Sequence, residues 1–477
     1  NATGQRVNYT SVIRISAYGG LVFALLYALS GGVAVLTGEF RYALLFLVTG
    51  SIVGAIGGMT LLLGERPERR SRPIDGLAVA IIFWLLAPIT LSAPFYPLFV
   101  DNDYGLLLSV YEAVSNLTTT GHSLVPASVT LPASVIFWRA ALHLFGAVAF
   151  LTMAMTVFAA LNLGGPGIHR TRFFTIPDGH FFDATKRSLR LIALFVFAGT
   201  ASICFLLLVG GIAPRDALAI SASVITTGLV DPDLAIQPVP GLSGLLAAVV
   251  VFGLCLGTLG VIFADALSRF DLRSALFDAE TISFAFLFVI AALFAFMAGL
   301  PLLQSAGWSL SSLSTSGLQL VDPERSNRIP LVLSLFPVLI GGAALSTAGG
   351  IKLSRMILLG RRVSGEFQQL GFRQSVHNFS FRGLTQTEET LIGVWVYLVG
   401  YIMACAIGIL VFSIFDQSFD SSILITIGAI ANAGHLLQGQ FTAETPAVVG
   451  FAMTGMILGR LEVIALLPAL NPYFWRN

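Results

Sequence analysis

A short segment that ends in glycine occurs four times along the chain, and this repeat constrains the fold more than any other feature. The copies are YEAVSNLTTTG, LAISASVITTG, GWSLSSLSTSG and LITIGAIANAG, which end at Gly121, Gly228, Gly317 and Gly434. Counted back from each glycine, position minus two is threonine or asparagine, position minus four is apolar, and position minus six is small. Each copy lies in its own long hydrophobic unit, so we expect four structural repeats.

The residue types of this segment suit a backbone site for a cation. Glycine adopts left-handed backbone conformations cheaply, which lets a short extended strand turn its carbonyls toward a common axis. Rings of such carbonyls can replace an ion's water shell. One TTTG alone is typical of a loop between helices. Four copies in register, each behind a short apolar helix, favour one shared site.

Composition predicts an all-α integral membrane protein. Hydrophobic residues make up 56% of the chain and charged residues 11%, far more apolar than a soluble core requires. A helix needs roughly 20 apolar residues to cross a bilayer. The chain offers such spans near 12–36, 42–63, 75–98, 134–160, 190–211, 241–267, 281–300, 329–359, 389–415 and 446–468.

Charge predicts the orientation of these spans. Most arginines and lysines fall in the connections after the second, fourth, sixth and eighth spans, and the opposite connections carry mainly aspartate and glutamate. The positive-inside rule places the basic connections and both termini in the cytoplasm and the four glycine segments outside. The basic residues used are Arg66, Arg69, Arg70, Arg72, Arg170, Arg172, Lys186, Arg187, Arg190, Arg269, Arg273 and those from Lys352 through Arg382, with Arg325 and Arg328 among the exceptions. The chain begins with Asn1, so we expect an initiating segment before it.

The repeats and the spans together predict the domain organisation. Two leading transmembrane helices occupy 1–72, and four pseudo-symmetric membrane-pore-membrane repeats occupy 73–165, 187–268, 279–360 and 388–477. Non-helical backbone survives at membrane depth only where protein or a water-filled cavity surrounds it. We therefore expect the four repeats to surround a central ion pore.

At this point the sequence resembles the Trk/Ktr/HKT superfamily of potassium transporters, and its leading spans are similar to those of the bacterial TrkH branch. The motifs that carry the resemblance are YEAVSNLTTTG at 111–121, FWRA at 137–140, GGAALSTAGGIKLSR at 341–355 and GRLE at 459–462. The resemblance implies a potassium-translocating subunit of a bacterial inner membrane. It also implies a homodimer in membrane lipid, with a cytoplasmic ring of nucleotide-binding regulatory subunits.

The resemblance also assigns the selectivity filter. It comprises the last four residues of each segment: Thr118, Thr119, Thr120, Gly121, Ile225, Thr226, Thr227, Gly228, Ser314, Thr315, Ser316, Gly317, Ala431, Asn432, Ala433 and Gly434. The expected K⁺ ligands are oxygens of Thr119, Thr120, Thr226, Thr227, Thr315, Ser316, Asn432 and Ala433. K⁺ is the transported ion, and no organic cofactor is expected in this chain.

A glycine-rich stretch from Gly341 to Gly350 interrupts the eighth span. Each glycine in a helix interior costs roughly 0.5–1 kcal/mol against alanine, so this helix should weaken at mid-membrane. Close packing against a neighbouring helix explains the composition equally well. The resemblance favours an intramembrane loop that obstructs the pore. The expected gate residues are Gly341, Gly342, Ser346, Thr347, Gly349, Gly350, Lys352 and Arg460.

Arg460 lies inside the last span, where a cation at the bilayer centre costs on the order of 2.5–3.5 kcal/mol. It either pairs with Glu462 or with helix ends, or it faces the pore, and the resemblance implies a positive barrier below the filter. Lys352 either shares that role or is a plain cytoplasmic anchor.

Four further residues have two interpretations each. Glu112 is expected to open the first pore helix, where it supports the helix N-terminus or attracts cations at the mouth. Arg139 is expected to pair with a nearby acid or to snorkel outward. His122 and His435 directly follow filter glycines. Either their protonation lowers transport below about pH 6.5, or both rings hydrogen-bond to neighbouring loops.

Three departures from the family pattern leave the ion preference open. Residues His143 to Ala149 stand where a glycine-rich stretch usually follows FWRA. The second repeat has ITTGLV where the family tends to have paired glycines, and the fourth has NAGHLL where GNVGPG is common. All four glycines are present, which favours potassium, but a sodium-permeable or non-conducting relative stays open.

The alternative from another class is an ion-coupled secondary transporter of a small solute with a midplane site. An enzyme is not expected, because HExxH, GxSxG and GxxxxGK are absent, and neither is a nucleic-acid partner. The polar connection from Arg361 to about Glu388 is the best surface for a soluble partner.

Overall fold

The computed structural model describes residues 7–65, 72–126, 129–158, 181–235, 244–320, 329–371, 380–381, 384–385 and 388–462. Several sequence predictions fall outside these residues. They concern Arg66, Arg69, Arg70, Arg170, Arg172, the middle of the polar connection at 372–379 and the end of the tenth span at 463–468.

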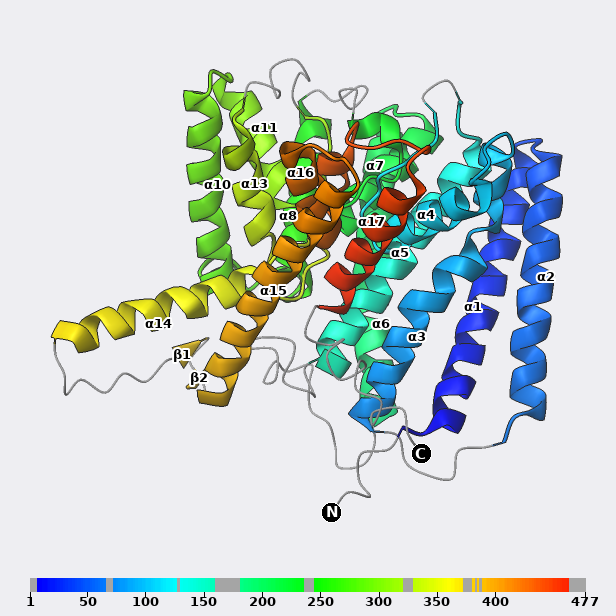
Figure 1. Ribbon diagram of the computed structural model, residues 1–477, viewed down its shortest axis with the longest axis horizontal. Helices are drawn as coiled ribbons and strands as arrows, with labels where there is room; N and C mark the ends of the chain where they lie inside the picture. Colours follow the sequence, from blue (N-terminus) through cyan, green and yellow to red (C-terminus); the bar gives the residue numbers. More distant parts are fainter. Residues whose placement is uncertain are drawn as a thin grey trace.

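Two leading helices, α1 (Tyr9–Leu36) and α2 (Phe40–Leu63), pack against each other at one edge of the molecule (Figure 1). The turn between them carries Glu39. Its carboxylate accepts hydrogen bonds from the backbone N–H groups of Ala133 at 2.8 Å and Ser134 at 3.1 Å, at the start of α5 (Ala133–Met153). A carboxylate at a helix N-terminus satisfies orphan donors and the helix dipole. This contact attaches the leading pair to the first repeat.

The remaining helices follow the predicted order of span, short helix and span, four times. The first repeat contains α3 (Pro73–Leu91), α4 (Gly105–Leu117) and α5, and the second contains α6 (Phe181–Val209), α7 (Pro214–Thr226) and α8 (Leu245–Ser268). The third contains α10 (Ala279–Met297), α11 (Leu302–Leu313) and α13 (Leu331–Ile340), and the fourth α15 (Glu388–Ile414), α16 (Phe419–Ile430) and α17 (Pro446–Leu461). The predicted fold class, all-α with membrane-pore-membrane repeats, is confirmed.

Shorter elements connect these helices. They are the 3₁₀ helices Ala93–Phe99, Pro232–Ala235 and Gly434–Leu437, the π-helical end of α5 at Ala154–Phe158, α9 (Leu272–Leu276), α14 (Leu353–Gly371), and a two-stranded antiparallel pair, β1 (Ser380–Phe381) and β2 (Leu384–Thr385).

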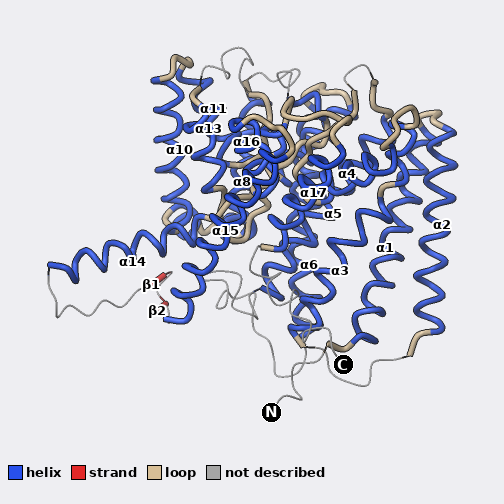
Figure 2. Tube along the Cα trace, viewed as in Figure 1, coloured by secondary structure: helices blue, strands red, loops and turns tan. Residues whose placement is uncertain are grey.

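The second helix of each repeat is too short to cross a membrane. These helices, α4, α7, α11 and α16, have 12 or 13 residues. At 1.5 Å per residue they are about 18–20 Å long, against a hydrocarbon core of about 30 Å. They lie in the upper half of the molecule, and the loops that follow them gather between them (Figure 2).

The structure replaces two of the ten predicted spans by shorter helices. Among the described residues, eight helices are long and apolar enough to span a membrane, whereas α13 and α17 are shorter apolar helices. The continuous span predicted at 329–359 is wrong, because α13 ends at Gly341, whose φ is 71°. The predicted weakness of this helix is confirmed. Residues 341–352 form a non-helical segment, which we call the interrupting loop.

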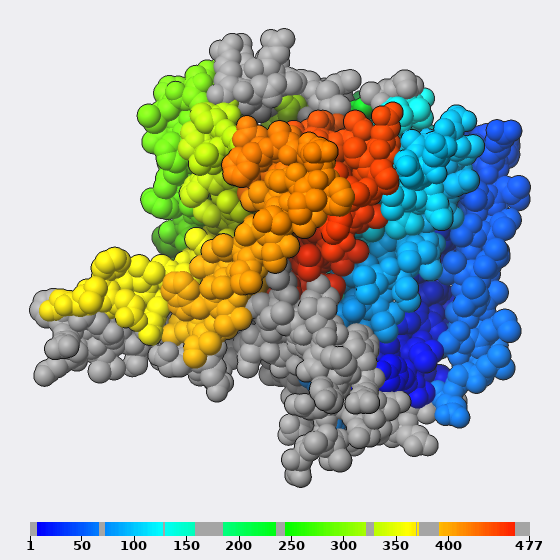
Figure 3. Space-filling model, in the orientation of Figure 1, coloured from blue at the N-terminus to red at the C-terminus, as the bar shows by residue number. Residues whose placement is uncertain are grey.

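The interrupting loop is held by α8 of the second repeat and by α10 of its own repeat. The N–H of Ala343 donates to the Thr258 carbonyl at 2.9 Å, and the N–H of Ala344 donates to Glu280 Oε1 at 2.9 Å. The carbonyl of Leu345 accepts from Val261 N–H at 3.0 Å. Beyond the loop the chain continues as α14, which projects sideways from the body of the molecule (Figure 3).

Candidate functional site

The four segments after the short helices share one backbone feature. Thr119, Thr227, Thr315 and Asn432 have φ values of 54°, 53°, 58° and 50°. Non-glycine residues rarely adopt this left-handed conformation, and threonine does so at a cost of about 1–3 kcal/mol. Four such residues at the ends of four short helices indicate that packing imposes the same turn in every repeat.

When the four repeats are aligned on their glycines, the turn in the second repeat is displaced by one residue from the turns in the other three. The residue with positive φ lies two positions before the glycine at Thr119, Thr315 and Asn432, but Thr227 lies one position before Gly228. A serine contact gives the same one-residue shift. Ser115 Oγ donates to the carbonyl of His122, seven residues on, at 2.6 Å, and Ser311 Oγ donates to Leu318 in the same way at 2.8 Å.

The matching serine in the second repeat is Ser223, whose Oγ accepts from Val230 N–H at 2.9 Å. Counted from Ser223, the residue in the place of Gly121 and Gly317 is Leu229. The four residues equivalent to 118–121 are therefore 226–229, and the predicted set Ile225 to Gly228 is one residue early. Ser223, rather than the glycine, is the sequence signal that marks the register.

The segments of different repeats lie against one another. Asn432 Nδ2 donates to Thr120 Oγ1 at 3.0 Å, which joins the fourth repeat to the first. A Cβ atom on Gly434 would lie 2.2 Å from the Thr120 carbonyl oxygen, and one on Gly228 would lie 2.0 Å from that of Thr119. Glycine is required at these two positions because another backbone approaches so closely. The sequence predicts these glycines from backbone conformation alone and does not show the close approach of a second backbone.

The interrupting loop contacts the second, third and fourth repeats directly, and the first repeat through Arg460. Thr347 Oγ1 donates to the Ile225 carbonyl of the second repeat at 2.9 Å, and Gly349 N–H donates to Thr315 Oγ1 of the third at 3.0 Å. A Cβ on Gly349 would lie 1.6 Å from the carbonyl oxygen of Ala431, in the fourth. Arg460 makes the link to the first repeat.

Arg460 is 2% exposed and bridges the loop and the first segment. Its Nε donates to the Thr118 carbonyl at 2.6 Å, and its Nη1 donates to the Thr347 carbonyl at 2.9 Å. Its Nη2 contacts the Thr119 hydroxyl. The alternative pairing with Glu462 is wrong, because Glu462 forms a salt bridge with Arg355.

Lys352 lies on the same side of the loop as Arg460. Its Nζ donates to the carbonyls of Ser346, at 3.1 Å, and Ala348. The Lys352 ammonium and the Arg460 guanidinium both lie over the ring of Phe150, at 5.4 Å and 4.8 Å from its centroid. Because Lys352 is only 5% exposed, its interpretation as a plain cytoplasmic anchor is wrong.

A buried ion pair between Glu112 and Arg139 packs against the backbone of the first and second segments. Glu112 and Arg139, each with a fully buried side chain, form a salt bridge. Arg139 also donates to the Val230 and Gly121 carbonyls. Glu112 Oε1 accepts from Ser123 Oγ and Leu124 N–H, both at 2.8 Å.

The pairing expected for Arg139 is thus present, but both interpretations of Glu112 are wrong. Helix α4 begins at Gly105, so Glu112 lies about two turns inside the helix rather than at its N-terminus. Its buried carboxylate also has no access to the outer solution. The sequence could not show this ion pair, since the two residues lie on different helices.

Two histidines belong to the same scaffold. His122 is buried and hydrogen-bonds to the Tyr111 hydroxyl, which supports a structural role for its ring. His143 contacts Asn116 Oδ1 through Nε2 at 3.2 Å and Thr226 Oγ1 through Nδ1 at 3.3 Å. Asn116 Nδ2 donates to the Glu112 carbonyl, so its Oδ1 faces the histidine and Nε2 is the donor. His143 therefore connects the first pore helix to the second segment.

Comparisons with known proteins agree with this architecture. The family model described as "TrkH: Cation transport protein" matches residues 299–470. The chain is 24% identical over 452 residues to the Trk system potassium uptake protein TrkH of Escherichia coli K12, covering 91% of this chain and 92% of that protein. It is 24% identical over 464 residues to TrkG of the same organism.

A solved structure is also similar. The crystal structure of the potassium transporter TrkH from Vibrio parahaemolyticus matches with a TM-score of 0.85 at 22% identity, covering 98% of this chain and 100% of that one. At this identity the match establishes the shared fold.

The buried ion pair yields a stability prediction. Arg139→Met leaves the Glu112 carboxylate buried without its cation, which should cost about 3–5 kcal/mol of unfolding free energy. Arg215→Met is the matched control, because Arg215 is 40% exposed in its salt bridge with Asp231 and should cost about 0–1 kcal/mol. The measurement is the thermal unfolding midpoint of the purified protein in detergent. Adding Glu112→Gln to Arg139→Met should restore part of the loss, and equal midpoints for the two arginine variants would contradict the assignment.

Proposed function

Because the chain belongs to the TrkH cation transport family, we propose that it is a pore subunit for potassium uptake whose filter is formed by the four glycine segments. As a member of this family it is a transporter of the membrane and not an enzyme. The observation that carries the proposal is the convergence of four repeats on one loop and one arginine. A solute transporter with a midplane side-chain site does not require this arrangement.

The proposed filter uses backbone and hydroxyl oxygens of residues 118–121, 226–229, 314–317 and 431–434. The interrupting loop, with Lys352 and Arg460, acts as the gate. In this state the Thr118 carbonyl of the first segment accepts a hydrogen bond from Arg460, and the Ile225 carbonyl, one residue before the second segment, accepts one from Thr347. A cation cannot pass between these groups until both bonds break.

The surroundings of the pore complete the proposal. The basic connections and both termini face the cytoplasm of a bacterial inner membrane, following the positive-inside rule. The protein forms a homodimer, and a cytoplasmic nucleotide-binding regulatory ring docks near α14. The domain limits are those of the sequence analysis, with the third repeat divided by the interrupting loop.

One observation favours a second candidate, a monovalent cation pathway that discriminates weakly between potassium and sodium. Leu229 stands where two other repeats have glycines with φ of 79° and 67°, Gly121 and Gly317. Leucine does not adopt that conformation cheaply, so the carbonyl at this level is oriented differently in the second repeat.

Growth separates these functions. A bacterium deficient in potassium uptake should grow on low potassium when it expresses this chain together with a matching regulatory subunit. Failure of growth, with the protein present in the membrane and no rubidium or sodium uptake into proteoliposomes, would refute a conducting pore. Sodium uptake without rescue of growth would select the second candidate.

Leu229→Gly tests the register of the second repeat. The change should raise the ratio of rubidium to sodium uptake by about fivefold, which corresponds to about 1 kcal/mol. Leu229→Ala is the control, since it removes the side-chain bulk but keeps Cβ and its backbone restriction. If alanine raises the ratio as much as glycine does, the effect comes from packing and not from the backbone.

Arg460→Ala tests the gate. It removes two charge-assisted hydrogen bonds that hold the loop against the first segment, each worth about 1.5–3 kcal/mol, so rubidium uptake without the regulatory subunit should increase about tenfold or more. Arg460→Lys keeps the charge but cannot bridge both carbonyls, and should give a smaller increase. Uptake equal to that of the unchanged protein in both variants would remove Arg460 from the gate.

A further inference from the structure

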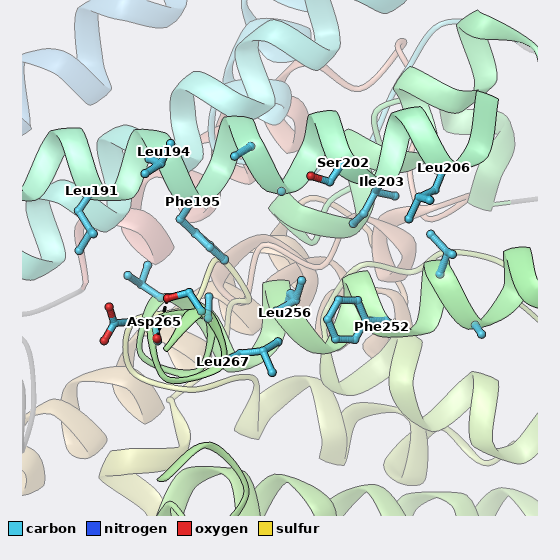
Figure 4. A pocket seen from close by; sticks show the side chains of 17 residues that line it. Leu191, Leu194, Phe195, Ser202, Ile203, Leu206, Phe252, Leu256, Asp265 and Leu267 are labelled. Carbon is cyan, nitrogen blue, oxygen red and sulfur yellow. Dashed lines mark hydrogen bonds between the residues drawn. The ribbon is translucent and has the colours of Figure 1, made fainter. Parts of the chain in front are cut away.

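An apolar groove runs along the second repeat between α6 and α8 (Figure 4). Its volume is about 630 Å³. Figure 4 shows Leu194, Phe195 and Leu206 on α6 facing Phe252 and Leu256 on α8. Both helices are long apolar spans, so the groove opens at membrane depth.

The backbone creates the groove. Helix α8 is kinked at Gly260, whose φ is 73°, and the groove is lined both before the kink, by Leu256, and after it, by Val261 and Ala264. A Cβ on Gly260 would lie 1.9 Å from the carbonyl oxygen of Leu345, so glycine is required there. The groove therefore depends on the contact between α8 and the interrupting loop.

The shape of the groove suits a chain-like apolar ligand. Its α6 wall extends from Leu191 to Leu206, about 22 Å at 1.5 Å per residue. This is more than half of the hydrocarbon thickness of about 30 Å. An extended acyl chain of a membrane lipid has this length and this narrow form.

The end of the groove near Leu191 carries both basic and acidic residues. Arg187 and Arg190 precede Leu191 and Leu194 by four residues, so they continue the same face of α6 beyond the groove. Both arginines are exposed. On the α8 side this end carries Asp265, which forms an ion pair with Arg269 at 3.0 Å. Positive charge therefore exceeds negative charge at this end, where a lipid headgroup would lie.

We propose that the groove binds one acyl chain of an anionic phospholipid, with the headgroup phosphate held by Arg187 and Arg190. The arginines select an anionic headgroup, and the apolar walls accept the chain. This proposal does not rest on the proposed transport function, and its test does not measure transport.

Native mass spectrometry of the full chain in mild detergent tests the proposal, with phosphatidylglycerol and phosphatidylcholine of identical acyl chains. We expect one retained lipid and a preference for phosphatidylglycerol. Arg190→Gln should reduce that preference about fivefold, from about 1 kcal/mol per basic residue near an anionic headgroup. Arg41→Gln, at an exposed arginine of α2, should leave it unchanged. Equal retention of both lipids by the unchanged protein would overturn the proposal.

A second pair of variants tests the location. Ala198→Phe places a ring inside the groove and should abolish lipid retention, whereas Ala201→Phe, at an exposed position of α6 outside the groove, should not. Equal retention in the two variants would overturn the proposal. So would a dimer that only Ala198→Phe dissociates, because a second copy would then cover the groove. Thermal unfolding midpoints check that both variants are folded.

Discussion

Backbone N–H and C=O groups that lie outside helices at membrane depth need hydrogen-bond partners, and the arrangement of this protein depends on that requirement. Four short helices end inside the apolar layer, and the carbonyls beyond them have no helical partners. The interrupting loop and Arg460 donate hydrogen bonds to such carbonyls on one side of the four segments. Thr347 donates to the Ile225 carbonyl, and Arg460 donates to the Thr118 carbonyl. Because the interrupting loop and Arg460 together contact all four repeats, the repeats cannot move independently of them.

The same geometry explains why two cations are tolerated in an apolar interior. The guanidinium of Arg460 and the ammonium of Lys352 contact backbone carbonyls, which carry partial negative charge, and both lie over Phe150. Carbonyls that are arranged to replace the water shell of a cation can also stabilise a protein cation. In the proposed pore, Arg460 and a permeating ion would compete for the Thr118 carbonyl and the Thr119 hydroxyl.

The sequence predicted what depends on local pattern. Apolar spans, the glycine segments and the weak helix at Gly341 to Gly350 all follow from composition and spacing, and among the described residues eight of the ten predicted spans are helices long enough to cross a membrane. The register of the second repeat does not follow, because its glycine lies one position earlier relative to the turn than the glycines of the other repeats. In the structure the fixed point is the serine that contacts the residue seven positions on, Ser223 with Val230.

Pairings between distant residues lay beyond sequence reasoning. Glu462 is close to Arg460 in the chain, but α17 ends at Leu461 and Glu462 has a φ of 50°, outside the helix. Glu462 pairs with Arg355 instead. Glu112 and Arg139 meet only because α4 and α5 pack together. These contacts depend on tertiary packing that no local pattern encodes.

The kink at Gly260 connects the membrane-facing surface to the pore. Val261, the next residue, lines the groove with its side chain and donates its N–H to Leu345 of the interrupting loop. A loop that moves away from the four segments must either break this bond or carry the second half of α8 with it. In the second case the groove changes shape when the loop moves, and by linkage whatever occupies the groove favours one position of the loop. In that case the surroundings of the second repeat are energetically coupled to the interrupting loop.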